Sequence, residues 1–374
     1  MPISFFELNR QNQDLKSELS IAIQSVIEKG QFIKGKEIEL FENQLAAYLR
    51  VKHVIACGNG TDALQIALMS LQLKPGDEVI VPAFTYIASI EVIVLLGLTP
   101  VLADIEPDTF NISTESLKNC IGPKTKAIIP VHLFGQCANM EAILEIANQY
   151  HLAVIEDNAQ SIGAICKFSS DKTAFAGCMG DIGTTSFFPS KNLSCFGDGG
   201  ALFTNNDELA KKIRMIANHG QSVQYKHDYI GVNSRLDTLQ AAILKIKLSH
   251  LPSFESNRIS NANLYLTLLN NLEGIELPYK AGFSTHVYNQ FTIRIKNGKR
   301  DALKAQLALN GIPSMVYYAS MVHEQNAYQN KCITRTGLPN ANMACKEVLS
   351  LPIYPELQKE EIETICNTLI SLLA

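Results

Sequence analysis

A lysine and an aspartate each stand beside a short apolar segment of this chain. Lys191 lies in the largely apolar stretch 186–193, before the glycine-rich run 197–200, and Asp157 follows the apolar run 153–155 and Glu156. Apolar surroundings lower the pKa of an amine and free a nucleophile, and a buried carboxylate needs a partner. A lysine that forms a Schiff base and an acid that keeps a pyridine nitrogen protonated serve pyridoxal 5'-phosphate (PLP) enzymes. The two residues therefore predict PLP chemistry; a surface lysine and a helix-capping aspartate are the alternatives.

A glycine-containing loop is the candidate phosphate site. The segment Gly58-Asn59-Gly60-Thr61-Asp62 follows an expected strand and opens an expected helix. Free backbone N–H groups at a helix N-terminus favour an anion, Thr61 adds a hydroxyl, and Gly60 allows close approach. Ordinary capping by Thr61 is the alternative. The spacing matches neither the Gly-x-Gly-x-x-Gly fingerprint nor a Walker loop, which disfavours a nucleotide-binding Rossmann site.

Three further segments carry candidate ligand contacts. Tyr86 follows the next expected strand and offers a ring to a flat cofactor, although a core aromatic is the alternative. Gln160 lies one helical turn after Asp157, within reach of the cofactor hydroxyl. Asn233 and Arg235 precede a long helix and suit an anion, with helix capping and a surface ion pair as the alternative.

The order of expected elements predicts an α/β fold. Short apolar runs without alternation indicate strands buried on both faces, separated by helical segments, and such a pattern favours a mostly parallel sheet with helices on both sides. Functional residues are then expected at the carboxyl ends of the strands. The expected strands are 54–56, 78–81, 100–104, 126–131 and 153–156, and the expected helices include 61–71, 89–96 and a segment 16–49 interrupted at 30–35.

The pattern changes after about residue 250. Residues 251–253 are expected to close a long helix, and the rest is of α+β type. We expect a large PLP-binding domain, 1–250, whose N-terminal segment packs on a smaller C-terminal domain, 251–374. The expected elements of the smaller domain are a strand at 290–295, an extended segment at 312–318, and helices at 300–309 and 359–373.

Composition excludes several classes of protein. The chain has 374 residues, of which 47% are hydrophobic and 18% charged, with a formal net charge of -4, which is typical of a globular protein and argues against nucleic acid as the main partner. The longest apolar stretch, 90–101, is too short to span a bilayer, and the polar start of the chain does not resemble a signal peptide. Nine cysteines without metal spacing predict no metal site and a reducing cytoplasm.

Together these motifs resemble the PLP-dependent nucleotide-sugar aminotransferases of fold type I. The resemblance covers nearly the whole chain, and segment 231–242 is similar to members that act on UDP-linked 3-keto sugars. It implies an aspartate-aminotransferase-like α/β fold, with a mostly parallel seven-stranded sheet in the large domain and a smaller C-terminal α+β domain. The motifs that carry it lie at 58–61, 82–85, 130–136, 155–157, 186–193, 197–200 and 349–352.

The resemblance also implies roles for single residues. Lys191 would bind PLP covalently and move protons, Asp157 would pair with the ring nitrogen, Gln160 would contact the ring hydroxyl, and Tyr86 would stack on the ring. The phosphate would be held by Gly60, by the backbone of Thr61 and Asp62, by Ser186, and by Asn233 of a neighbouring subunit of a homodimer. Candidate substrate contacts are Arg235, Tyr317 and His323. The sequence departs from the family at Tyr317-Tyr318-Ala319, where His-Tyr-Pro is frequent, and this leaves the substrate open.

The implied reaction is a ping-pong transfer of the amino group of L-glutamate to a nucleotide-linked 3-keto or 4-keto sugar, with pyridoxamine phosphate (PMP) between the two halves. It would serve the biosynthesis of amino sugars for a surface polysaccharide or glycan. Three alternatives stay open: a PLP- or PMP-dependent sugar dehydratase, a non-catalytic regulatory member of the fold, and a dinucleotide-binding oxidoreductase. The dehydratases carry histidine in place of the lysine, so Lys191 argues against them.

Overall fold

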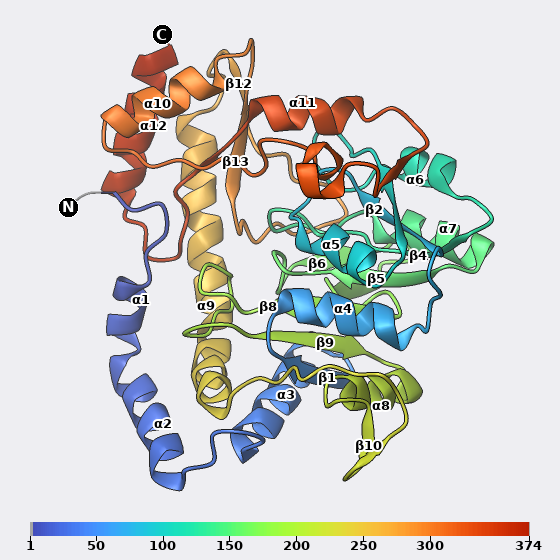
Figure 1. Cartoon of the computed structure of the whole chain (residues 1–374). Coiled ribbons are helices and arrows are strands. Elements are labelled where there is room, and N and C mark those ends of the chain that lie inside the picture. The colour runs from blue at the N-terminus through green and yellow to red at the C-terminus, as the bar shows by residue number, and fades with distance from the viewer. Residues whose placement is uncertain (1–2, 374) are drawn as a thin grey trace.

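An eight-stranded sheet forms the centre of the larger part of the chain in the computed structural model, which describes residues 3–373 (Figure 1). Only β9 is antiparallel to its neighbours, β1 and β8; every other neighbouring pair is parallel. The α/β fold with a mostly parallel sheet is therefore confirmed. The strands, in spatial order, are β1 (His53–Cys57), β9 (Gly200–Thr204), β8 (Ile182–Ser186), β5 (Ala153–Asp157), β4 (Thr125–Ile128), β2 (Glu78–Pro82), β3 (Thr99–Ala103) and β14 (Ile333–Thr334).

The prediction of seven strands is short by one. β14 comes from the C-terminal part of the chain and pairs with β3 through Ile333 and Thr334. A strand of two residues leaves no periodic pattern in the sequence, and only tertiary packing places it at the sheet edge.

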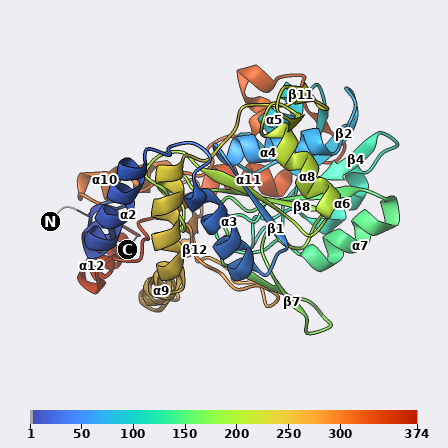
Figure 2. The ribbon, with the colours of Figure 1, turned by 90° about the horizontal axis from the view of Figure 1, so that it is seen from below.

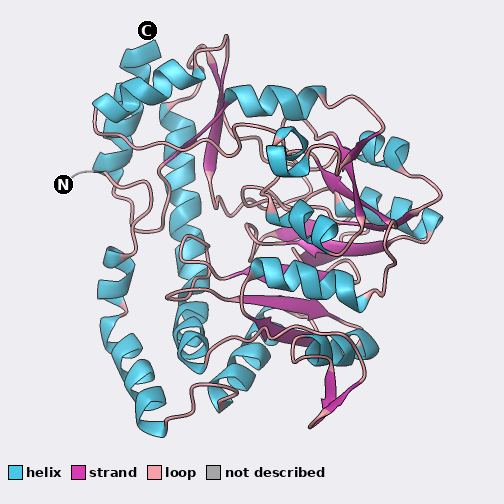
Figure 3. Cartoon of the chain, viewed as in Figure 1, coloured by secondary structure: helices cyan, strands magenta, loops and turns pink. Residues whose placement is uncertain are grey.

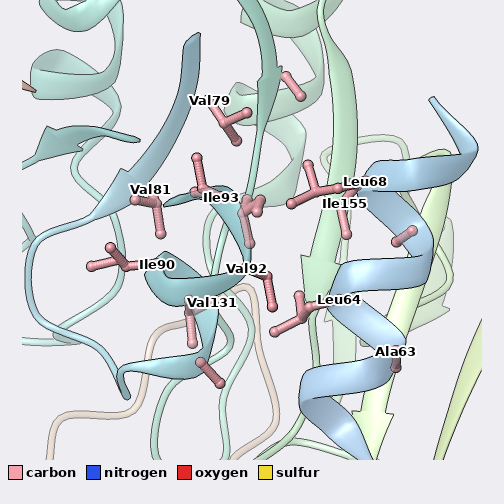
Figure 4. Packing of buried hydrophobic residues seen from close by; sticks show 14 of the residues in the cluster. Ala63, Leu64, Leu68, Val79, Val81, Ile90, Val92, Ile93, Val131 and Ile155 are labelled. Atoms are coloured by element: carbon pink, nitrogen blue, oxygen red, sulfur yellow. The ribbon is translucent and has the colours of Figure 1, made fainter. Parts of the chain in front are cut away.

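Helices cover both faces of this sheet, as Figures 1 and 2 show. On β2, Val79 and Val81 pack into one core with α4 (Gly60–Ser70), α5 (Ala88–Leu95) and α8 (Asp207–Ile216), while Ile80 packs into another with α6 (Thr114–Cys120) and α7 (Met140–Tyr150). Figure 4 shows the first of these cores, where Leu64 and Leu68 of α4 face the sheet. Since most strands of this sheet bury both faces, the absence of alternation in the sequence has a direct physical cause.

One long helix, α9 (Thr238–Leu268), joins the two parts of the molecule (Figure 1). Its first half packs with α3 (Lys36–Leu49) against β1 and β9, through Leu244 and Leu248, and its second half enters the C-terminal core through Ala262 and Tyr265. The prediction that this helix ends at 251–253 is wrong, because α9 continues through Pro252. A proline inside a helix costs about 3 kcal/mol, and packing at both ends of α9 offsets that cost.

The C-terminal part has its own core around a three-stranded antiparallel sheet, seen beside α9 in Figure 3. The helices expected at 300–309 and 359–373 are present as α10 (Arg300–Leu309) and α12 (Lys359–Leu373). The expected boundary at residue 250 falls inside α9, so we propose that the two domains share this helix. The sheet consists of β12 (Ile275–Glu276), β13 (Phe291–Ile295) and β15 (Val348–Leu351), flanked by α11 (Pro339–Glu347).

Of the N-terminal helices, α2 (Lys16–Lys29) packs beside α9, and the short α1 (Asn9–Asp14) contacts α2. Arg10 pairs with Glu361 of α12 at 2.6 Å, which ties the start of the chain to its end. None of the helices within residues 3–373 has the length and apolar character needed to cross a membrane. The remaining short elements are β6 (Ile165–Lys167), β7 (Thr173–Phe175), β10 (Gln221–Val223), β11 (Lys226–His227) and the 3-10 helices at Val322–Glu324 and Asn326–Tyr328.

Candidate active site

A pocket of about 760 Å³ lies at the carboxyl ends of the parallel strands. Asp157 ends β5, Ser186 ends β8, and the loops after β1 and β2 supply the other walls. Polar residues therefore gather where the fold type predicts. The lining residues are Asn59, Gly60, Thr61, Asp62, Leu64, Thr85, Tyr86, Ala88, Val131, Asp157, Ala159, Gln160, Ser186, Phe188, Ser190, Lys191, Asp198, Gln290, Tyr317 and Tyr318.

Most of the predicted site residues meet in this pocket, and three do not. Asn233, Arg235 and His323 are absent from its lining. Arg235 lines a second pocket, of about 440 Å³, at the start of α9. The predicted residues that line the first pocket are Gly60, Thr61, Asp62, Tyr86, Asp157, Gln160, Ser186, Lys191 and Tyr317.

Lys191 sits on a tight turn after β8. Its backbone N–H donates to the carbonyl of Phe188 at 2.8 Å, and buried Phe187 holds the start of the turn in the core. Within residues 3–373, no hydrogen-bond or ion-pair partner reaches its Nζ. Burial lowers the pKa of the amine from 10.5 to about 8, against an opposing effect of the Asp157 charge. A substantial fraction of Lys191 is therefore a neutral amine, able to attack a carbonyl, near pH 8.

Asp157 is held rigidly at the end of β5, and its side chain is only 5% exposed. Its Oδ2 accepts a hydrogen bond from the Ser89 hydroxyl at 2.7 Å, and its Oδ1 accepts one from the backbone N–H of Ala159 at 3.1 Å. Each carboxylate oxygen keeps a further lone pair for a cation in the pocket.

Gln160 has a fixed orientation. Its Oε1 accepts from the backbone N–H of Phe134 at 2.7 Å, and its Nε2 donates to the hydroxyl of Tyr318 at 3.2 Å. Because the oxygen faces Phe134, the amide presents N–H to the pocket. A ligand oxygen is therefore the group that Gln160 can bind, which suits the predicted contact with a ring hydroxyl.

The phosphate loop differs from the prediction at one residue. The backbone N–H of Asp62 donates to the Asn59 side chain at 2.8 Å, because Asn59 caps α4. The Asp62 carboxylate accepts from Ser234 at 2.6 Å. Asp62 is therefore an anchor of the loop, and the N–H groups of Gly60 and Thr61 are the ones that remain for an anion.

The pocket has the groups that PLP requires. A Cβ at Gly60 would lie 2.8 Å from the Cβ of Ser186, so a glycine at this position lets Ser186 pack closely against the loop. The Lys191 amine suits the aldehyde of PLP, and the Asp157 carboxylate suits its pyridine nitrogen. The backbone N–H groups at the start of α4 suit the phosphate, and the half-exposed ring of Tyr86 suits the ring face.

Three residues beside the predicted set belong to this site: Thr85, Ser89 and Tyr318. Thr85 and Ser89 are polar residues four positions apart in an otherwise apolar segment, and they lie on either side of the start of α5. That signal was available in the sequence. Tyr318 comes from the C-terminal part, and no local pattern connects it with Gln160.

A family model for the DegT/DnrJ/EryC1/StrS aminotransferase family matches residues 13–370. The chain belongs to this family. It is 44% identical over 367 residues to UDP-2-acetamido-2-deoxy-3-oxo-D-glucuronate aminotransferase of Pseudomonas aeruginosa, covering 98% of this chain and 99% of that protein. It is 44% identical over 366 residues to a "Pleiotropic regulatory protein" of Geobacillus stearothermophilus, covering 96% of each. The structure of S. venezuelae DesV in complex with a ketimine intermediate superimposes with a TM-score of 0.94 at 38% identity, covering 100% of this chain and 98% of that one.

The fold is therefore fold type I, and the family is PLP-dependent. Family membership and the intact pocket agree on an aminotransferase. Both disfavour the oxidoreductase alternative, as does the loop after β1, which lacks the glycine spacing of a dinucleotide site.

Proposed function

We propose that this protein transfers the amino group of L-glutamate to the ketone of a nucleotide-linked sugar. The observation that carries the proposal is the pairing of Lys191, an amine without a partner, with Asp157, a fixed carboxylate, in one pocket. The Pseudomonas relative is named for a UDP-linked 3-oxo sugar, so a UDP-linked 3-keto sugar is the substrate class that we favour. The product would be an amino sugar for a surface polysaccharide or glycan.

PLP, when bound, supplies an aldehyde carbon to which the amino group becomes attached and a ring that accepts electrons. Lys191 would hold it covalently and, once released as a neutral amine, would carry a proton from the amino-donor carbon to the cofactor in the first half-reaction and from the cofactor to the sugar carbon in the second. Asp157 holds the proton on the ring nitrogen. Gln160 donates to the ring oxygen, and Tyr86 covers a ring face. Gly60, Thr61 and Ser186 hold the phosphate.

The C-terminal segment supplies the proposed sugar contacts. Tyr317 and Tyr318 line the pocket, and Tyr317 is our candidate for a contact with the substrate. His323 lies outside the lining, and its buried Nδ1 has no hydrogen-bond partner among residues 3–373. We therefore give His323 a supporting position behind the segment 317–318.

The test is an assay of 2-oxoglutarate formed from glutamate with UDP- and dTDP-linked 3-keto and 4-keto sugars. We expect turnover with one of these ketones and none with Lys191→Ala, while Lys211→Ala, at an exposed lysine, keeps full activity. Turnover that survives in Lys191→Ala would refute the assignment. Purified protein that binds PLP and releases no 2-oxoglutarate with any ketone would favour the regulatory alternative that the Geobacillus relative's name suggests.

We further propose that the protein is a homodimer whose second subunit completes each site. Of the charged residues that line the main pocket, Lys191 is the cation, and three are acids: Asp62, Asp157 and Asp198. The phosphate, the donor carboxylates and the nucleotide are all anions, so more cations are needed. The second pocket offers four basic side chains, Lys34, Lys36, Arg214 and Arg235, against two acids.

Exposed apolar side chains near this second pocket support a shared interface. Tyr225 is 85% exposed and Ile230 is 89% exposed, both in the hairpin region that precedes Asn233. Burial of such side chains against another chain is favourable. The second copy would bring its Asn233 and Arg235 to the main pocket of the first.

Mixing two inactive variants tests this arrangement. Lys191→Ala and Arg235→Ala damage the same site from different chains, so a mixed dimer has one site with both native residues. Random exchange of subunits should restore about a quarter of the native activity. No recovery after exchange, shown to be complete by native mass spectrometry, would contradict a shared site.

We place the reaction in the cytoplasm, where reducing conditions keep thiols free. All nine cysteines are free thiols in this structure. This proposal is tested by fractionation of cells that express the tagged protein.

A further inference from the structure

Two buried hydroxyl groups adjoin Asp157, one between β2 and α5 and one in the first turn of α5. Ser89 is 0% exposed and Thr85 is 3% exposed. The Ser89 Oγ lies 2.7 Å from Asp157 Oδ2 and 3.1 Å from Thr85 Oγ1. A carboxylate has no proton to give, so Ser89 donates to Asp157. The Ser89 oxygen is then free to accept from Thr85, so the two hydroxyls form a chain of hydrogen bonds that ends at the acid.

The local fold explains why these two side chains reach the same carboxylate. Thr85 follows β2, and Ser89 lies in the first turn of α5, one helical turn later. The rest of the buried face of α5 is apolar, with Ile90, Val92 and Ile93 in the core. A hydroxyl in such surroundings is costly unless it has a partner, and here both hydroxyls have one.

We propose that Thr85 and Ser89 form a relay of hydrogen bonds that keeps Asp157 ionised and aimed at the ring nitrogen of PLP. They are positioning residues, since they act through Asp157. The inference rests on the role proposed above for Asp157 and adds the groups that sustain it.

The physical reason is that the contact between Asp157 and the ring nitrogen has two competing forms, which differ in the position of one proton. In a buried site, an acid and a pyridine nitrogen can share their proton as an ion pair or as a neutral pair. Donors to the carboxylate stabilise its charged form. Ser89 on Oδ2 and the N–H of Ala159 on Oδ1 therefore both favour the ion pair, with the proton on the ring.

Other titratable groups near Asp157 do not replace this relay. Lys191 and Tyr318 are the side chains whose charge states Asp157 influences. In the resting holoenzyme Lys191 would be bonded to the cofactor, and burial raises the pKa of the Tyr318 phenol. The adjacent Glu156 accepts its hydrogen bonds from His132 and the loop 177–180.

The experiment uses holoenzyme reconstituted with PLP that carries 15N in the ring. The ring-nitrogen chemical shift reports whether the proton is on the ring, and stopped-flow mixing with glutamate gives the rate of the first half-reaction. We expect Ser89→Ala to move the shift towards unprotonated pyridine and to slow the half-reaction about 10-fold, the value of one hydrogen bond to a charged group. Thr85→Val should move both in the same direction by about 3-fold, because one neutral donor is lost.

Matched variants separate positioning from general damage. Ser70→Ala removes another fully buried serine hydroxyl, one that donates to Ala67 O at 2.7 Å in α4, and should change neither quantity. Ser89→Thr keeps the hydroxyl and should restore both. If Ser89→Ala fails to bind PLP, Thr85→Val decides the question alone.

A native ring-nitrogen shift in Ser89→Ala and Thr85→Val overturns the relay. Asp157→Asn distinguishes this failure from a failure of the proposed function. If Asp157→Asn moves the shift and the Ser89 and Thr85 variants do not, only the relay is wrong. If Asp157→Asn also leaves the shift unchanged, the role of Asp157 itself is wrong.

Discussion

Glu156 and Asp157 are adjacent acids, and we predict that the first serves stability and the second the reaction. Glu156 is 0% exposed and accepts four hydrogen bonds: from His132 Nε2 at 2.8 Å and from the backbone N–H groups of Gly177, Met179 and Gly180 at 2.9, 2.6 and 2.6 Å. The contact with His132 is a hydrogen bond between a neutral imidazole and an anion, because His132 Nδ1 accepts from Ala138 N at 3.0 Å.

The perturbation is Glu156→Gln, which keeps the shape and replaces one carboxylate oxygen by an NH2 group. That group then faces N–H donors, so two hydrogen bonds to a charged oxygen are lost. At about 1.5 to 3 kcal/mol each, the free energy of unfolding should fall by about 3 to 6 kcal/mol. For 374 residues at about 2.1 cal/mol/K each, the entropy of unfolding is about 0.8 kcal/mol/K, so the melting temperature should drop by about 4 to 8 °C.

The assay is urea unfolding and thermal melting of the apoprotein. Glu208→Gln at an exposed carboxylate is the control and should change the free energy by less than about 0.5 kcal/mol. Asp157→Asn loses one hydrogen bond to a charged oxygen where Glu156→Gln loses two, so its free energy of unfolding should fall by no more than about 1.5 to 3 kcal/mol, yet it should lose most of its turnover. If Glu156→Gln were as stable as the control, the hydrogen bonds of Glu156 would not contribute to the free energy of unfolding as we infer.

Three further predictions concern protonation and backbone space. The reactivity of Lys191 with an amine-selective reagent in the apoprotein, followed by mass spectrometry, should reach half its maximum near pH 8; a midpoint above pH 10 would contradict its desolvation. Burial lowers the pKa of His286 to about 3 in the folded protein. Between about pH 6.5 and pH 3, the unfolded chain therefore binds a proton at His286 that the folded protein does not bind. Stability should therefore fall by about 1.4 kcal/mol per pH unit between pH 6.5 and pH 4, and this component should vanish in His286→Gln; equal slopes in both proteins would refute it. Gly60→Ala places a Cβ 2.8 Å from Ser186 and should weaken PLP binding at least about 10-fold by equilibrium dialysis, whereas Gly282→Ala, with open space around it, should bind PLP normally.

The candidate site was predicted from the sequence wherever a local pattern carried the chemistry. Lys191 in its apolar stretch and Asp157 at a strand end were both found in this way, and the structure places both in one pocket. The phosphate loop was located, but the use of the Asp62 amide was not foreseen, because Asn59 and not Thr61 caps α4. Capping depends on which side chain reaches the free N–H groups, and neighbouring candidates look alike in sequence.

What the sequence by itself determined is the set of elements and the residues that end them. Segments such as 78–82 and 153–157 become parallel strands because a sheet covered by helices on both faces buries their apolar side chains. Parallel alignment then brings the carboxyl ends of these strands together. Only the tertiary structure decided two contacts between distant segments, β14 with the sheet edge and Tyr318 with Gln160. It also decided that α9 continues through Pro252. Each depends on packing that outweighs a weak or opposing local preference, and local patterns contain no information about a partner more than a hundred residues away.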